Sequence, residues 1–110
     1  MLINIIKSYR EVIAVCDSKL LGKKFVSRAG EDPTGSSEEG KFQLDIKENF
    51  FNGEKTSEEK AIKFMQKMAD EDSTFYIVGE KSVQTAIKAG IISEEGVKKI
   101  GGVPFALVLL

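Results

Sequence analysis

One stretch, residues 74–90, constrains the fold more than any other part of this sequence. Residues 75–78 read Phe-Tyr-Ile-Val, a run of aromatic and β-branched residues that predicts a strand buried on both faces. Gly79 ends the run, and apolar residues then recur at positions 83, 86, 87 and 91, as on one face of a helix. Gly90 stands where a helix ends in the left-handed conformation. The stretch predicts a strand, a glycine turn and a helix.

The remaining apolar runs predict a sheet around this unit. Strands are expected at 2–9 and 12–16, joined as a hairpin, and also at 25–26, 41–46, 97–100 and 103–110. Thr56 and Glu59 have the spacing of a capping box, which predicts a helix over 57–69. Pro104 cannot donate to a sheet, so its strand should start there or lie at an edge. We expect an α+β or α/β fold, a mixed sheet covered by helices at about 57–69 and 80–90.

The chain of 110 residues is long enough for one domain with one core. Residues 27–40, SRAGEDPTGSSEEG, hold three glycines, a proline, three serines and four acids around a single alanine. So little apolar surface cannot offset the entropy of ordering. The sequence therefore predicts a single domain with a mobile loop at 27–40.

The composition excludes several chemistries. The sequence has no histidine and one cysteine, which rules out Ser-His-Asp and Cys-His catalysis and a closed zinc site within the chain. A lone cysteine forms no intramolecular disulfide, which favours a reducing cytoplasm. The apolar residues 103–110 are far fewer than the roughly 20 that span a bilayer. We expect a soluble cytoplasmic protein without membrane association, cofactor or metal, and we assign no catalytic residue.

The turn after the central strand is a candidate anion site formed by Gly79, Glu80, Lys81 and Ser82. A glycine before a helix presents free amides to an anion, and the Lys81 and Ser82 side chains are available to help. The alternative is an ordinary glycine turn in which Glu80 itself satisfies the helix dipole. The glycine spacing of a P-loop or dinucleotide motif is not present.

Two further places are candidates for a cleft. Cys16 and Asp17 end a strand expected at the centre of the sheet, but no histidine lowers the thiol pKa, and a buried inert cysteine is the alternative. Gly101 and Gly102 form a turn whose backbone has room to approach a ligand, although turn geometry alone explains them. A single cleft holding all four, together with Glu80, would support an enzymatic function.

The basic run at residues 19–28 is a candidate surface for RNA or a protein partner. Residues 1–28 carry six Lys and Arg against two Asp and Glu, an asymmetry that the rest of the chain reverses. The residues proposed for contact are Lys19, Lys23, Lys24, Phe25 and Arg28, with Phe25 available for stacking. Solvated lysines are the alternative. Phe50 and Phe51 similarly fit either an exposed protein-binding spot or a core anchor.

Several strings together resemble the small archaeal proteins grouped as domain of unknown function 424. They are CDSKLLGKKF at 16–25, GKFQLDI at 40–46, FFNGE at 50–54, VGEKSVQTAIKAGII at 78–92 and KKIGGVPFA at 98–106. The likeness runs nearly from end to end. It implies an archaeal source, a cytoplasmic location and a shared fold, and it implies no activity.

Two functional hypotheses therefore stay open. The first is a non-enzymatic binding module that contacts RNA, ribonucleoprotein or a protein partner through the basic surface. The alternative is a small-molecule (phosphate or carboxylate) binding site or an enzymatic site at the strand-turn-helix around Gly79. A homodimer is possible if the apolar terminal strand lies at a sheet edge.

Overall fold

The computed structural model describes residues 1–7, 9–31 and 42–109. Its main feature is a six-stranded mixed sheet with the order β5-β1-β2-β6-β8-β7. These strands are β1 (Leu2–Lys7), β2 (Glu11–Cys16), β5 (Glu54–Lys55), β6 (Thr74–Val78), β7 (Lys98–Ile100) and β8 (Val103–Val108). The α+β architecture that the sequence predicts, with its amino-terminal β1–β2 hairpin, is confirmed.

The centre of the sheet is a parallel pair, β2 and β6, and every other neighbouring pair is antiparallel. Val12 is opposite Thr74 and Cys16 is opposite Val78, so both strands end at the same edge of the sheet. The residues that follow, Asp17 and Gly79, are thereby brought together. This edge is where ligands are commonly bound in α/β sheets.

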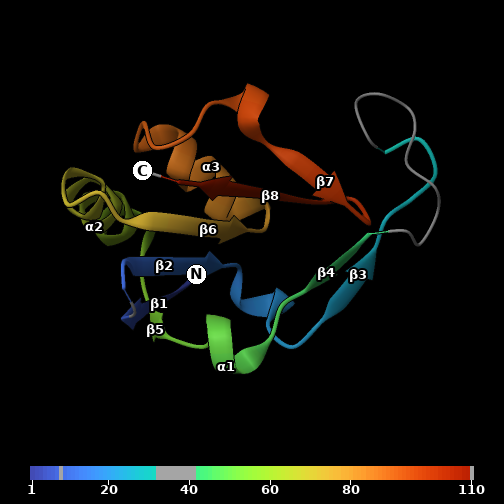
Figure 1. Cartoon of the computed structure of the whole chain (residues 1–110), viewed down its shortest axis with the longest axis horizontal. Helices are drawn as coiled ribbons and strands as arrows, with labels where there is room; N and C mark the ends of the chain where they lie inside the picture. The colour runs from blue at the N-terminus through green and yellow to red at the C-terminus, as the bar shows by residue number, and fades with distance from the viewer. Residues whose placement is uncertain (8, 32–41, 110) are drawn as a thin grey trace.

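Two helices, α2 (Glu58–Asp70) and α3 (Glu80–Lys88), cover one face of the sheet and lie behind it in Figure 1. The core between them contains residues of β2, β6, α2 and α3, among them Ile13, Val15, Phe75, Ile77, Ala61, Met65, Val83 and Ala86. Both predicted helices are confirmed. The predicted cap is wrong by one residue, because Ser57 Oγ accepts from the Lys60 amide while the Thr56 hydroxyl donates to the Glu54 carbonyl.

The opposite face is covered over only part of its area. A 3₁₀ turn η1 (Ser18–Leu20), a two-stranded ribbon of β3 (Lys24–Val26) and β4 (Gln43–Asp45), and the short helix α1 (Glu48–Phe51) pack on it. Leu20, Leu44, Ile46 and Phe51 form a second core with Cys16 and Val78. The strands predicted near 25–26 and 41–46 are confirmed, but they form a separate ribbon, and α1 was not expected.

The terminal strand β8 lies between β6 and β7, so the expectation of an edge strand is wrong. The other expectation, a start at Pro104, is right to within one residue. The Pro104 carbonyl accepts from the Gly79 amide at 2.8 Å, and the Gly79 carbonyl accepts from the Val83 amide of α3 instead, so no amide donor is needed from Pro104. A second 3₁₀ turn, η2 (Glu94–Gly96), precedes β7.

Most of the mobile loop predicted at 27–40 lies outside the described residues. The described part, 27–31, is held by backbone hydrogen bonds, from the Ser27 amide to the Phe42 carbonyl and from the Glu31 amide to the Arg28 carbonyl. No helix in the described ranges has the length and apolar character that crossing a membrane requires.

Candidate functional site

The carboxyl edge of β2 and β6 is organised by one buried carboxylate, that of Asp17. Asp17 Oδ1 accepts from the Ser82 amide at 2.8 Å and from the Ser82 hydroxyl at 2.7 Å. Asp17 Oδ2 accepts from the Lys81 amide at 3.1 Å. A helix leaves its first amides without intrahelical partners, and a negative charge there is favoured by the helix dipole. Asp17 therefore caps α3 from a neighbouring strand.

This cap bears directly on the anion site expected at Gly79, Glu80, Lys81 and Ser82. Two of the amides assigned to an external anion already have a carboxylate acceptor within the chain. Gly79 has φ +107° and ψ 153°, and a Cβ atom placed there would lie 2.5 Å from Asp17 Cγ. Glycine is thus required because the Asp17 carboxylate lies against the turn, a reason that needs no bound ligand.

A shallow pocket of about 560 Å³ lies beside this cap. Its lining includes Asp17, Lys19, Glu80, Lys81 and Gln84. Among the described residues, the Lys19 and Lys81 ammonium groups make no hydrogen bond or ion pair. The expected anion site thus has cations at its mouth, while its Lys81 and Ser82 amides are occupied by Asp17.

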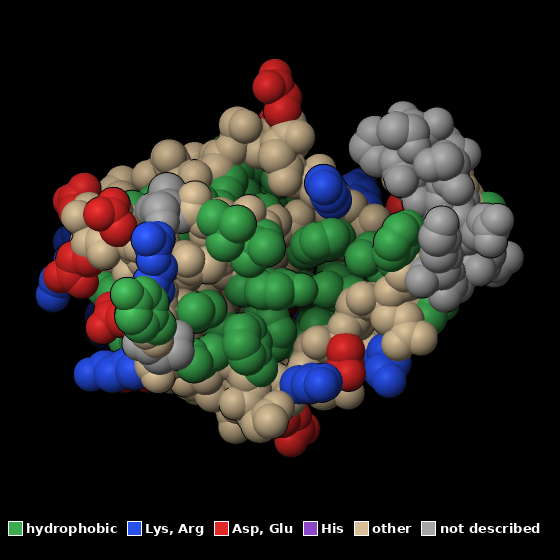
Figure 2. Space-filling model, viewed as in Figure 1, with side chains coloured by type: hydrophobic (Ala, Val, Ile, Leu, Met, Phe, Trp, Pro, Cys, Tyr) green, Lys and Arg blue, Asp and Glu red, His purple; other side chains and the backbone are tan. Residues whose placement is uncertain are grey.

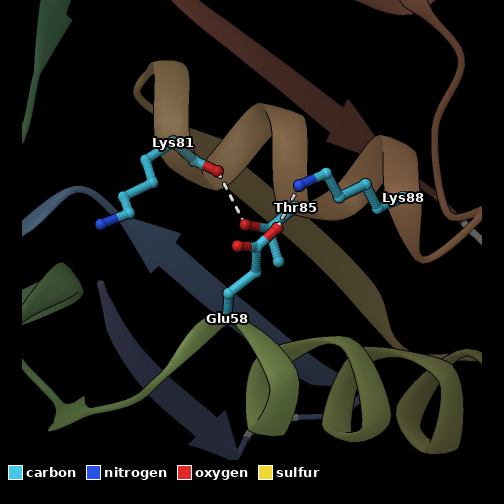
Figure 3. Close-up of polar contacts among 4 residues, drawn as sticks. All are labelled: Glu58, Lys81, Thr85 and Lys88. Atoms are coloured by element: carbon cyan, nitrogen blue, oxygen red, sulfur yellow. Dashed lines mark hydrogen bonds and ion pairs between the residues drawn. The ribbon is translucent and has the colours of Figure 1, made fainter.

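Across the same pocket, α2 and α3 are joined by an ion pair that Figure 3 shows in close-up. Lys88 Nζ lies 2.6 Å from Glu58 Oε1, and this hydrogen bond keeps the pKa of the Glu58 carboxyl below its ordinary value. The Thr85 hydroxyl donates to the Lys81 carbonyl at 2.8 Å. Lys88 is therefore engaged, and the Lys81 side chain points away from the pair.

Cys16 does not reach this pocket. Its side chain is fully buried in the second core, and burial together with the adjacent Asp17 charge raises the thiol pKa to about 11. A nucleophilic thiol needs the opposite shift. The other cleft candidates separate in part: Asp17 lines the 560 Å³ pocket, Gly102 lines a different pocket of about 190 Å³, and Glu80 lines both. Neither of these two pockets contains both Asp17 and Gly102, and neither contains Cys16.

The basic run at 19–28 follows the η1 turn and β3. Lys19, Lys23 and Arg28 are exposed, and Lys24 Nζ lies 4.0 Å from Asp45 Oδ2. Phe25 is half-buried in the second core, with its Cβ against the Gly101 turn, so its ring is less available for stacking than expected. RNA contact through these residues stays a prediction.

The Gly101–Gly102 turn joins β7 to β8 and holds a carboxylate. Glu31 Oε1 accepts from the Gly101 amide at 2.9 Å, and Glu31 Oε2 accepts from the Gly102 amide at 2.7 Å. The Arg28 amide also donates to Glu31 Oε1, at 3.0 Å. These bonds, that from Arg28 foremost, lower the pKa of Glu31. The backbone of this turn therefore does approach an acidic group, which is the Glu31 carboxylate of the same chain.

Sequence reasoning missed an apolar surface on the sheet, which we name the open face: Ile6, Phe50, Tyr76, Phe105 and Leu107. Leu107 is 54% exposed and the other four are half-buried. Tyr76 and Leu107 are opposite one another on β6 and β8, and Phe105 is opposite Val78 on the same face. Figure 2 shows hydrophobic side chains gathered over the middle of this face.

The amino-acid sequence gives only a weak indication of the open face. Residues 75–78 were expected to be buried on both faces, whereas Tyr76 is only half-buried. Its ring makes edge-on contacts with Phe50 and Phe51, at centroid distances of 5.9 and 5.6 Å. Phe51 is a core anchor at 3% exposure, while Phe50 lines the surface, so the two alternatives for this pair each describe one residue.

The fold and the site define an α+β domain with a mixed sheet, two helices on one face and a partly covered opposite face. A family model described as a protein of unknown function, DUF424, matches residues 35–110, and the chain belongs to this family. The crystal structure of an uncharacterized conserved protein from Methanopyrus kandleri is similar, with TM-score 0.78 and 24% identity over 97% of this chain and 88% of that one. This likeness shows a shared fold. Among curated proteins, none matches.

Proposed function

We propose that this protein is a non-enzymatic binding module that docks a partner protein on the open face. The observation that carries the proposal is the exposure of Leu107 beside the half-buried Tyr76 and Phe105, in the middle of a sheet face that its own η1, β3–β4 and α1 elements leave uncovered. Aromatic side chains such as those of Tyr76 and Phe105 are enriched at protein interfaces. Their burial contributes roughly 25 cal/mol per Å² of apolar surface.

The charges beside the open face favour a partner that carries acidic residues. Lys98 is exposed and opposite Phe105 in the sheet register, which places it on the same face. Lys47 is also exposed and lines a hollow of about 370 Å³ next to Phe50 and Tyr76, while the Asp45 carboxylate in the same hollow lies 4.0 Å from Lys24 Nζ. A protein surface with an apolar centre and acidic edges would match this arrangement. Aliphatic Ile6 and Leu107 do not stack on bases, which favours protein over RNA here.

Two further points support a binding role over catalysis. Neither of the two pockets that Glu80 lines contains both Asp17 and Gly102, and the thiol of Cys16 is buried with a raised pKa. A module acting in a reducing cytoplasm would also keep this lone thiol unmodified, so we retain the cytoplasmic location as part of the proposal.

A matched pair of variants tests the docking surface. Leu107→Asp places a charge in the open face, whereas Ile5→Asp changes a comparably exposed aliphatic residue of β1 outside it. Each tagged variant, beside the unmodified chain, is used to capture proteins from an extract of the native host. The captured protein is then purified and its Kd measured. Leu107→Asp should weaken binding at least tenfold, about 1.4 kcal/mol, and Ile5→Asp should not.

Three outcomes overturn the proposal. Equal Kd values for both variants place the contact elsewhere. Binding that nuclease treatment removes, and that falls steeply with salt, assigns the contact to RNA. Sedimentation that shows self-association lost only in Leu107→Asp would make the occupant a second copy of this chain.

A second candidate is weak anion binding at the 560 Å³ pocket, favoured by the ammonium groups of Lys19 and Lys81, which pair with no residue in the described ranges. Thermal shifts with phosphate test it, with Lys19→Glu/Lys81→Glu as the variant and Lys63→Glu/Lys67→Glu on α2 as the control. Gly79 is unsuitable for this test because its substitution collides with Asp17. No stabilisation of the unmodified chain, or the same stabilisation in both double variants, removes this candidate.

A further inference from the structure

The tip of the β7–β8 hairpin carries a small receptor for a carboxylate group. Three amides, those of Gly101, Gly102 and Arg28, donate to the two oxygens of the Glu31 carboxylate at 2.7–3.0 Å. In Figure 1 this tip lies beside the far end of the β3–β4 ribbon. Successive backbone amides that converge in this way form an anion-binding concavity.

The backbone of the tip requires glycine at both positions. Gly101 has φ +59° and Gly102 has φ +78°, both in the left-handed region. A Cβ atom at Gly101 would lie 2.9 Å from the Val26 carbonyl oxygen and 3.0 Å from Phe25 Cβ. The receptor is therefore held against β3, and the close approach leaves no space for a larger residue.

Arg28 adds a guanidinium beside the amides. A Cβ atom at Gly102 would lie 3.0, 3.1 and 3.1 Å from Arg28 Nη1, Cζ and Nη2, so the guanidinium lies face-on over this glycine. Its N–H groups project in the plane of the group, parallel to the surface it covers. They make no hydrogen bond to any described residue, which leaves planar donors next to the concavity.

We propose that Gly101, Gly102 and Arg28 form a binding site for an external oxyanion, a carboxylate or a phosphate group, that Glu31 fills as a displaceable internal ligand. Glu31 is brought to the site by a four-residue turn in which its amide donates to the Arg28 carbonyl. Gly30, the residue before it, has φ +74°, and no described atom lies within 4 Å of an added Cβ. Of the three amide contacts, those of Gly102 and Arg28 are exposed and that of Gly101 is partly buried, so a ligand reaches the site from the surface. This proposal does not depend on the open face.

The test follows the Gly101 and Gly102 amides by ¹H–¹⁵N NMR at pH 7 and constant ionic strength. Acetate and phosphate are titrated separately, with chloride replacing them in the reference. In the unmodified chain, at least one of the two anions should shift both amides saturably. Glu31→Ala removes the internal competitor, so the half-saturating concentration should fall roughly tenfold, as expected when only about a tenth of the sites are free. Which anion binds more tightly distinguishes a carboxylate from a phosphate ligand.

Matched controls keep the test decisive. Glu71→Ala removes an exposed acid elsewhere and should leave the half-saturating concentration unchanged. Arg28→Lys keeps the charge, loses the planar donors and should weaken binding in the Glu31→Ala background. If neither anion shifts the unmodified chain, or if only Glu31→Ala binds, Glu31 is a permanent structural contact and the proposal is overturned.

Discussion

Asp17 and Ser82 lie 65 positions apart in the sequence and meet at the carboxyl edge of β2, where one Asp17 oxygen accepts from both the amide and the hydroxyl of Ser82. This contact joins the end of one central strand to the first turn of the helix that follows the other. It gives the amino end of α3 an anionic partner from within the chain. The contact is therefore a structural element of the fold, and it limits how this edge is able to bind anything else.

Removing the carboxylate should destabilise the protein strongly. Asp17→Ala leaves two amides and the Ser82 hydroxyl without their acceptor. Because Asp17 is only 6% exposed, water has little access to replace it. We expect the free energy of unfolding to fall by roughly 2–4 kcal/mol, as measured by urea denaturation. Asp70→Ala, at an exposed position of α2, is the control and should change stability by less than about 0.5 kcal/mol. Equal effects would contradict the capping role.

Two buried serines should respond oppositely to the same substitution. Ser82→Ala loses the 2.7 Å hydrogen bond to Asp17, and we expect a cost of about 1–2 kcal/mol. Ser73 is 1% exposed and its hydroxyl has no hydrogen-bond partner in the described structure. Ser73→Ala removes an unsatisfied buried group and should be neutral or stabilising. Thermal unfolding of the two variants side by side checks the sign. A clear loss in Ser73→Ala would show that its hydroxyl has a partner in solution.

Alanine substitutions at Gly79 and Gly90 distinguish the cost of a steric collision from the cost of the left-handed backbone conformation. Both have positive φ, +107° and +79°, but a Cβ meets Asp17 at Gly79 and nothing within 4 Å at Gly90. Gly90→Ala should cost about 1 kcal/mol, the usual strain of an alanine in the left-handed region. Gly79→Ala adds the displacement of Asp17 and should cost roughly 3 kcal/mol or more. The measurement is again urea denaturation, and similar costs at both positions would be the contrary result.

The thiol of Cys16 should be unreactive in the folded state. It is fully buried and its pKa is raised from 9.0 to about 11, so a disulfide reagent should label it far more slowly in buffer than in urea. Between pH 9 and 11 the unfolded thiol has lost its proton and the folded thiol keeps it. Stability should therefore decrease as the pH rises, by at most about 1.4 kcal/mol per pH unit.

The variant Cys16→Ala isolates the contribution of the thiol to the pH dependence of stability from that of all other groups. Its stability should decline less steeply over the same pH window than that of the unmodified chain. Parallel declines, or fast labelling of the folded protein, would show that the thiol is accessible.

Much of the fold follows from local patterns that act within a few residues. The helices α2 and α3, the central strand β6 and the β1–β2 hairpin were all expected, because apolar spacing and glycine or capping signals operate over short distances. The Thr56 cap was misplaced because Thr56 and Ser57 are both good caps, and only packing selects between them. The β3–β4 ribbon was taken for part of the main sheet because strand pairing is a long-range property.

The candidate sites could be predicted only in part. That Asp17, Gly79 and Ser82 would matter was expected from their positions at strand and helix ends, but their mutual contact was not. Likewise Gly101 and Gly102 were recognised as a turn, while the Glu31 carboxylate that their amides hold lies about 70 residues away in the sequence. Short-range patterns carry no information on which distant side chain satisfies a free amide.

The sequence by itself determined the two long helices and most of the strands, and it excluded histidine and intramolecular disulfide chemistry, since these depend on residue type and spacing alone. Only the tertiary structure decided that Asp17 occupies the amino end of α3, where an anion was expected, and that Tyr76 stays half-buried and Leu107 exposed on the sheet. The physical reason is that a free amide forms a hydrogen bond, and an apolar face packs, with whichever distant residues the folded chain places next to it. That partner is set by the register of β2 against β6 and of β6 against β8.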